Sequence, residues 1–83
     1  MITLEQAKSL HHGQVLYHDK NRNADHTAER WRVNGAVKVW KRSPQRVKVP
    51  LKHGLRYYGY LTEHNLDILC LSDPTTRRSH NGR

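Results

Sequence analysis

The chain has 83 residues, of which 35% are hydrophobic and 7% aromatic, so it allows one small domain with a small core and excludes a deep, enclosed substrate cavity. Its 15 Lys and Arg outnumber the 7 Asp and Glu, and the formal charge of +8 favours an anionic partner, with nucleic acid as the first candidate. The single cysteine, Cys70, excludes an intramolecular disulfide. The lack of an apolar run of ~18 residues and of a signal-peptide core predicts a soluble, cytoplasmic protein without a membrane span.

A short amphipathic helix is expected at residues 3–11. Thr3 is a suitable N-cap, and Gln6 occupies the capping-box position three residues later. Apolar residues then recur at helical spacing on one face, at Leu4, Ala7 and Leu10.

Short extended segments separated by turns follow the helix. They are expected at residues 14–17, 29–33, 36–42, 46–51, 55–61 and 66–71. Residues 20–28 are polar and rich in Asn and Asp, and are therefore expected to form a loop. A single helical turn is expected at residues 62–65, and nothing apolar remains after Leu71, so residues 72–83 are expected to form a disordered tail.

A hairpin is expected around Asn34-Gly35, and it has two possible registers. A two-residue turn would place Trp31 opposite Lys38 and mix apolar with charged residues on both sides. A three-residue loop over residues 33–35 would instead place Trp31 opposite Val37. Because burial selects a register with one apolar side, we expect the three-residue loop.

A second turn, at residues 43–45, extends this separation to a third strand. Three turn residues would place Trp40 opposite Lys48 and Val39 opposite Val49. One side of the sheet is then apolar, with Trp31, Val37, Val39, Val47, Val49 and Leu51. The other side is basic around one tryptophan, with Arg30, Arg32, Lys38, Trp40, Arg42, Arg46 and Lys48.

The order of elements predicts a mainly β fold. A helix followed by about five short antiparallel strands, with a 3-10 turn at residues 61–65 before the last, resembles the SH3-like small β-barrels. The resemblance covers residues 13–72. Because the apolar face of such a sheet needs cover that a short helix cannot fully give, we expect the sheet to close into a small, strongly bent barrel, as a single domain at residues 1–71. The small size and basic charge are also similar to those of small phage-encoded proteins.

The basic side predicts a nucleic-acid-binding module. Its Lys and Arg side chains would contact phosphates while Trp40 stacks on an unpaired base. An acidic protein surface is the alternative partner. The structural alternative is a solvated face whose tryptophan packs under arginine stems.

Two further functions remain open. The resemblance to SH3-like barrels implies that Tyr57, Tyr58 and Tyr60 could line a groove of a protein adaptor, although such aromatic residues also serve as barrel core. The third hypothesis is a small metal-free ribonuclease, with His53 as general acid or base beside Tyr57. The segment at residues 49–53 is similar to basic toxin ribonucleases with a double-stranded-RNA-binding-like fold. The histidines lack zinc-ligand spacing, so no metal or other cofactor is predicted, and a binding module is favoured over an enzyme.

Overall fold

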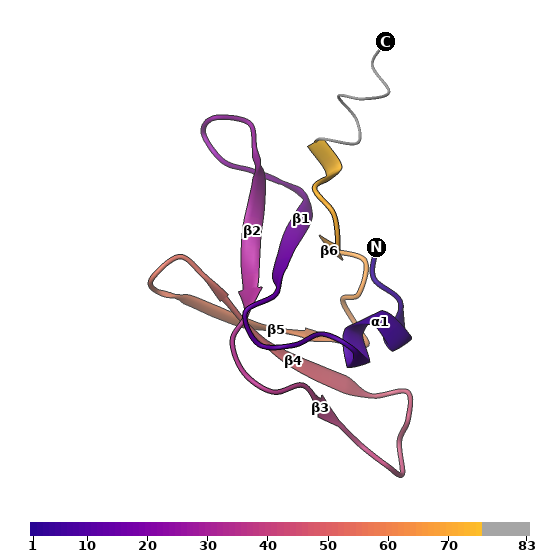
Figure 1. The fold of residues 1–83 in the computed structure, drawn as a ribbon. Coiled ribbons are helices and arrows are strands. Elements are labelled where there is room, and N and C mark those ends of the chain that lie inside the picture. Colours follow the sequence, from indigo (N-terminus) through magenta and orange to yellow (C-terminus); the bar gives the residue numbers. More distant parts are fainter. Residues whose placement is uncertain (76–83) are drawn as a thin grey trace.

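The computed structural model describes residues 1–75, which form one six-stranded antiparallel sheet with a short helix against it (Figure 1). The elements are α1 (Leu4–Lys8), β1 (Val15–Arg22), β2 (Ala28–Val33), β3 (Lys38–Val39), β4 (Val47–His53), β5 (Tyr57–Thr62) and β6 (Leu69–Cys70). The predicted mainly β class is confirmed. Most of the tail predicted at residues 72–83 lies outside the described residues, and within them Pro74 is buried.

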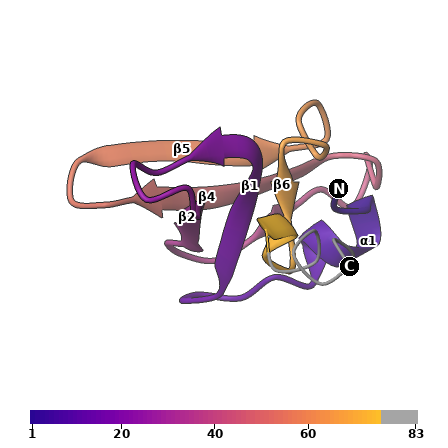
Figure 2. The ribbon, with the colours of Figure 1, turned by 90° about the horizontal axis from the view of Figure 1, so that it is seen from above.

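The sheet is open, so the predicted closed barrel is wrong. The strand order is β3-β4-β2-β1-β6, with β5 on the other edge of β4. The β1–β2 hairpin crosses the β4–β5 hairpin rather than running alongside it (Figure 2). In the described residues β5 pairs only with β4, and the two-residue β6 pairs only with β1, so no ladder joins these strands to close a barrel.

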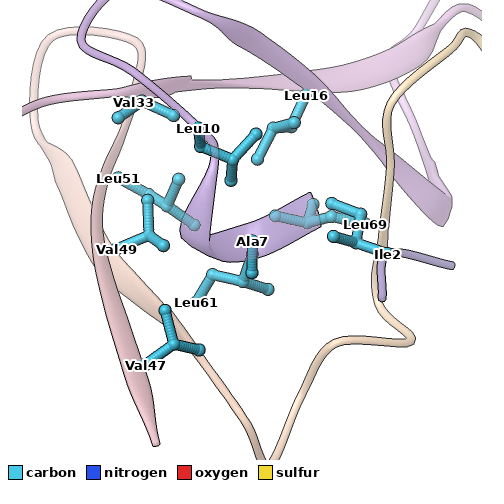
Figure 3. Packing of buried hydrophobic residues seen from close by; sticks show 10 residues of the cluster. All are labelled: Ile2, Ala7, Leu10, Leu16, Val33, Val47, Val49, Leu51, Leu61 and Leu69. Carbon is cyan, nitrogen blue, oxygen red and sulfur yellow. The ribbon is translucent and has the colours of Figure 1, made fainter. Parts of the chain in front are cut away.

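Helix α1 and its flanks cover the core where the sheet does not close. The predicted capping box is confirmed, since the Thr3 hydroxyl accepts the Gln6 amide (3.1 Å) and the Gln6 side chain accepts the Thr3 amide (2.9 Å). The helix is shorter than expected and ends at Lys8. Ile2 and Ala7 are fully buried among side chains from both hairpins (Figure 3). The N-terminal segment thereby supplies the cover that barrel closure was expected to give.

The predicted Asn34-Gly35 hairpin is wrong. Both edges of β2 are occupied, by β1 and by β4, so β3 cannot pair with it. Trp31 lies opposite Leu16 rather than Val37. The Asn34 amide donates instead to the carbonyl oxygen of Pro50 (2.8 Å), so a long-range hydrogen bond replaces the local turn.

The predicted pairing of β3 with β4 has the right partner but the wrong register. Lys38 lies opposite Lys48 and Val39 opposite Val47, so Trp40 is not opposite Lys48. The loop between these strands spans residues 40–46, which contain two successive hydrogen-bonded turns instead of one three-residue turn. Because the shift is two residues, the paired residues Lys38, Val39, Val47 and Lys48 keep their predicted sides of the sheet.

Two local predictions also need correction. Strand β1 continues through the polar residues up to Arg22, which pairs with Ala28, so the loop is confined to residues 23–27. Those strand residues lie at the solvated end of a hairpin and therefore carry no apolar alternation. The expected helical turn is a pair of successive turns, closed by amide-to-carbonyl hydrogen bonds from Asn65 to Thr62 (3.1 Å) and from Ile68 to Asn65 (3.2 Å). No helix within residues 1–75 is long and apolar enough to cross a membrane.

Candidate nucleic-acid interface

Strand β4 separates core side chains from cations, of which Lys48 is exposed and Lys52 half-buried. Its buried residues alternate along the strand, at Val47, Val49 and Leu51. Lys48 and Lys52 therefore point to the opposite face. Across the ladder, Tyr58 lies directly opposite Lys52, and Tyr60 lies opposite Pro50, the residue between the two lysines. The β4–β5 hairpin thus presents two lysines and two tyrosines on one face.

Each of these tyrosine rings has a lysine ammonium group over it. The Lys48 Nζ lies 4.2 Å from the centre of the Tyr60 ring, and the Lys52 Nζ lies 5.6 Å from that of Tyr58. Both tyrosines are more than half exposed, at 54% for Tyr60 and 64% for Tyr58. Such contacts hold a cation beside an aromatic plane without burying either group.

Trp40 forms a second cluster of this kind beyond β3. The guanidinium carbon of Arg46 lies 4.1 Å from the centre of the Trp40 ring, and the Lys38 Nζ lies 5.1 Å away. Lys38 is directly opposite Lys48, which joins this cluster to the β4–β5 hairpin. The tryptophan is partly buried, whereas both cations are exposed.

A cleft of about 480 Å³ lies at the other end of the same face. It is lined by Arg30, Arg32 and Lys52, together with residues such as Asn34 and the turn after β4. Arg32 lies directly opposite Lys52. Three positive side chains around one cleft make it suitable for an anionic group.

We refer to this surface as the cation–aromatic face. It consists of Arg30, Arg32, Lys38, Trp40, Arg46, Lys48, Lys52, Tyr58 and Tyr60. Six of the seven residues predicted for the basic side belong to it, and the seventh, Arg42, is exposed in the loop between β3 and β4. Lys52, Tyr58 and Tyr60 were missing from the predicted set. The glycine at position 54, just before the tyrosine-bearing segment, was the sequence signal that β4 turns back into an adjacent strand, and the structure gives it a φ of 65°.

In the part of the chain that the structure describes, no ion pair involves the Lys and Arg side chains of the cation–aromatic face. Within residues 1–75 both ion pairs join a glutamate to a histidine, and neither contains Lys or Arg. Glu63 pairs with His64 (3.1 Å) and accepts the Val47 amide (3.0 Å). Hydrogen bonds from the backbone amides of Val47 and Glu63 hold the pKa of this carboxyl below its ordinary value. The carboxylate is therefore ionised near neutral pH, and the charge of Arg46 also lowers its pKa, although the two groups form no ion pair within the described residues.

A polar network occupies the other side of the sheet, around Glu29. The carboxylate accepts a hydrogen bond from the Trp31 indole (2.9 Å) and one from Asn21 (3.4 Å). Partial burial acts to raise the pKa of Glu29, but these hydrogen bonds and the charges of His53 and His18 together hold it below its ordinary value. Glu29 is therefore a structural anion that orients Trp31.

His53 belongs to this network and not to the cation–aromatic face. Its ring stacks on Trp31 with centres 5.0 Å apart, and its Nε2 lies 3.7 Å from the Glu29 carboxylate. Its Nδ1 lies 2.7 Å from the carbonyl oxygen of Arg30, which can only accept, so Nδ1 carries a proton. Both nitrogens thus face acceptors. This geometry holds the ring in place, with the Tyr57 ring centre 6.0 Å away.

The three tyrosines of β5 do not share one face. Tyr58 and Tyr60 belong to the cation–aromatic face, whereas Tyr57 lies opposite His53, and their ring centres are 6.0 Å apart. A single aromatic groove lined by all three is therefore not formed. No family model, curated protein or solved structure matches this chain, so its function has to be inferred from the geometry of the site.

Proposed function

We propose that this protein binds nucleic acid through the cation–aromatic face. The observation that carries the proposal is the alternation of cations with aromatic rings, from Arg46 and the partly buried Trp40 at one end to Lys52 and the exposed Tyr58 at the other, with no Lys or Arg ion pair within residues 1–75. Phosphates require cations, and nucleobases stack on aromatic planes. An acidic protein surface would use the cations but would have no comparable use for the rings.

Salt dependence is the first test of this proposal. Binding of fluorescently labelled oligonucleotides, followed by anisotropy at several salt concentrations, should weaken steeply as salt rises. Lys48→Gln and Lys52→Gln should each remove one cation that neutralises a phosphate. Each variant should therefore reduce the slope of log affinity against log salt by about 0.7 for a single strand and about 0.9 for a duplex.

Lys20→Gln is the matched control for charge. It removes the same charge from an exposed position in β1 that is not part of the cation–aromatic face. This variant should keep the wild-type slope to within the error of the measurement. Equal losses in all three variants would show a general charge effect and contradict binding at this face. If no oligonucleotide bound even at low salt, the proposal would be wrong and an acidic protein would become the partner to seek.

A further inference from the structure

The side chains of the cation–aromatic face indicate whether the nucleic acid is single-stranded or a duplex. This inference rests on the proposed function. In a duplex the bases stack on each other, so a protein surface reaches only their edges and the phosphates. In a single strand the base planes are free to stack on aromatic side chains. The rings on this face therefore distinguish the two forms, whereas the cations alone would not.

Along β5 a tyrosine ring with a neighbouring lysine occurs at two alternating positions. Tyr58 and Tyr60 are two residues apart on one face, which corresponds to about 6.6 Å along the strand. Each ring has its own lysine, Lys52 and Lys48 respectively. One ring and one cation match the two groups of one nucleotide, because the base can stack on the ring and the phosphate can contact the cation.

The cleft extends this arrangement beyond the tyrosines. Lys52 contacts the Tyr58 ring and also lines the cleft that contains Arg30 and Arg32. A chain whose bases stack on Tyr60 and then Tyr58 would reach these arginines with its next phosphates. On the other side, the partly buried Trp40 ring lies under Lys38 and Arg46, so this end of the face offers phosphate-binding cations and not a free ring.

We infer that the partner is a single-stranded nucleic acid, whose successive bases stack on Tyr60 and Tyr58 and whose backbone continues into the arginine-lined cleft. Stacking accepts any base, because each has an aromatic plane, so the binding is tolerant of sequence. The rings on this face thus select the single strand over the duplex, and its cations supply the salt-dependent part of the affinity.

The test compares a labelled 12-nucleotide single strand with a blunt-ended hairpin duplex, by anisotropy at one salt concentration. We expect tighter binding of the single strand. Tyr58→Leu and Tyr60→Leu should each weaken single-strand binding by about 5- to 150-fold, the range given by stacking of one base. Duplex binding should change less than twofold, since the charge is unaltered.

Two further variants serve as controls. One keeps the aromatic ring, and the other removes a tyrosine that is not on the cation–aromatic face. Tyr58→Phe keeps the ring and should retain single-strand affinity. Tyr57→Leu removes an equally exposed tyrosine (66%) of the same strand from the opposite face and should also leave affinity unchanged. Circular dichroism of each variant shows whether the sheet is intact.

The outcomes separate the inference from the proposed function. Equal or tighter duplex binding that does not respond to the leucine variants would overturn the inference and leave the proposed function standing. A loss in Tyr57→Leu as large as that in Tyr58→Leu would also overturn it, because the face would be wrongly assigned. Failure of both nucleic acids to bind the wild-type protein would overturn the proposed function itself.

Discussion

Lys38 and Lys48 lie directly opposite each other across the β3–β4 ladder, and neither is in an ion pair within the described residues. Like charges at directly opposed positions destabilise a sheet. An opposite-charge pair at the same positions would favour the fold. The arrangement therefore costs stability and concentrates positive charge beside Trp40.

Lys38→Glu should change stability and binding in opposite directions. The new cross-strand pair with Lys48 should stabilise the fold by about 0.2–1 kcal/mol. For a domain of this size, that raises the thermal midpoint by up to about 8 °C. Thermal unfolding at low salt measures the gain, and oligonucleotide anisotropy should show a weaker complex. A lower midpoint together with unchanged affinity would contradict both the repulsion and the binding role.

The network around Glu29 predicts a loss of stability in acid. A carboxyl whose pKa is lowered in the folded state contributes stability above its unfolded pKa, near 4.5, and loses it as the pH falls through the folded value. Chemical unfolding of the wild type from about pH 6 to about pH 3 should therefore show that the free energy of unfolding decreases below about pH 4.5. Glu29→Gln should show a shallower decrease in that window. Asp67→Asn removes a carboxylate from an exposed turn and is the control; the same change of slope in both variants would contradict a specific role for Glu29.

Replacing Gly59 by alanine should stabilise the protein. Gly59 lies within β5, where glycine costs backbone entropy, and a Cβ built there would lie 3.7 Å from the Trp31 ring, an ordinary packing distance. We expect a gain of about 0.4–1 kcal/mol in the free energy of unfolding, measured by urea denaturation.

Gly35→Ala is the contrasting variant. Gly35 has a φ of 145°, and a Cβ there would lie 3.1 Å from the ring of Pro50. The same glycine-to-alanine change should therefore destabilise the protein by more than about 1 kcal/mol. If the two variants shifted stability in the same direction, the backbone geometry assigned to one of these positions would be wrong.

The N-terminal capping box should contribute to the stability of the whole domain. Thr3→Ala removes the hydroxyl that accepts the Gln6 amide and should cost about 0.5–2 kcal/mol in unfolding free energy. Thr3→Ser keeps the acceptor and should retain most of the stability. Because Ile2 is buried next to the cap, a full effect in global unfolding is expected, and a loss confined to local fraying would contradict the role of α1 as part of the core.

The faces of the strands could be predicted from the sequence, because alternation is a local property. Val47, Val49 and Leu51 are buried, and Lys48 is exposed, as the alternation indicates. Pairing between distant segments could not be predicted in the same way, and only the sequence-adjacent pair of β3 and β4 was assigned to the right partner. Asn34-Gly35 is a strong local turn signal, yet β1 and β4 occupy both edges of the preceding strand.

The same distinction explains which residues of the candidate site were missed. Lys52 and Tyr58 are four and ten residues beyond Lys48, and only the β4–β5 ladder brings all three to one surface. Closure of the barrel was expected because an exposed apolar sheet face needs cover. The amphipathic pattern of residues 3–11 identifies a helix but does not show which surface it buries.

The hydrogen bond from the Ile2 amide to the Leu66 carbonyl oxygen (3.0 Å) joins two ends of the domain that are 64 residues apart in sequence. Ile2 also packs in one cluster with Leu69 of the last strand (Figure 3). During synthesis the N-terminal helix therefore emerges long before the residues that cover it, and a five-residue helix is not stable alone. The contacts between the two ends form only when the last strand is available, so the domain completes its fold as a unit once that strand has been made, at the slow rate of a sheet rich in distant contacts.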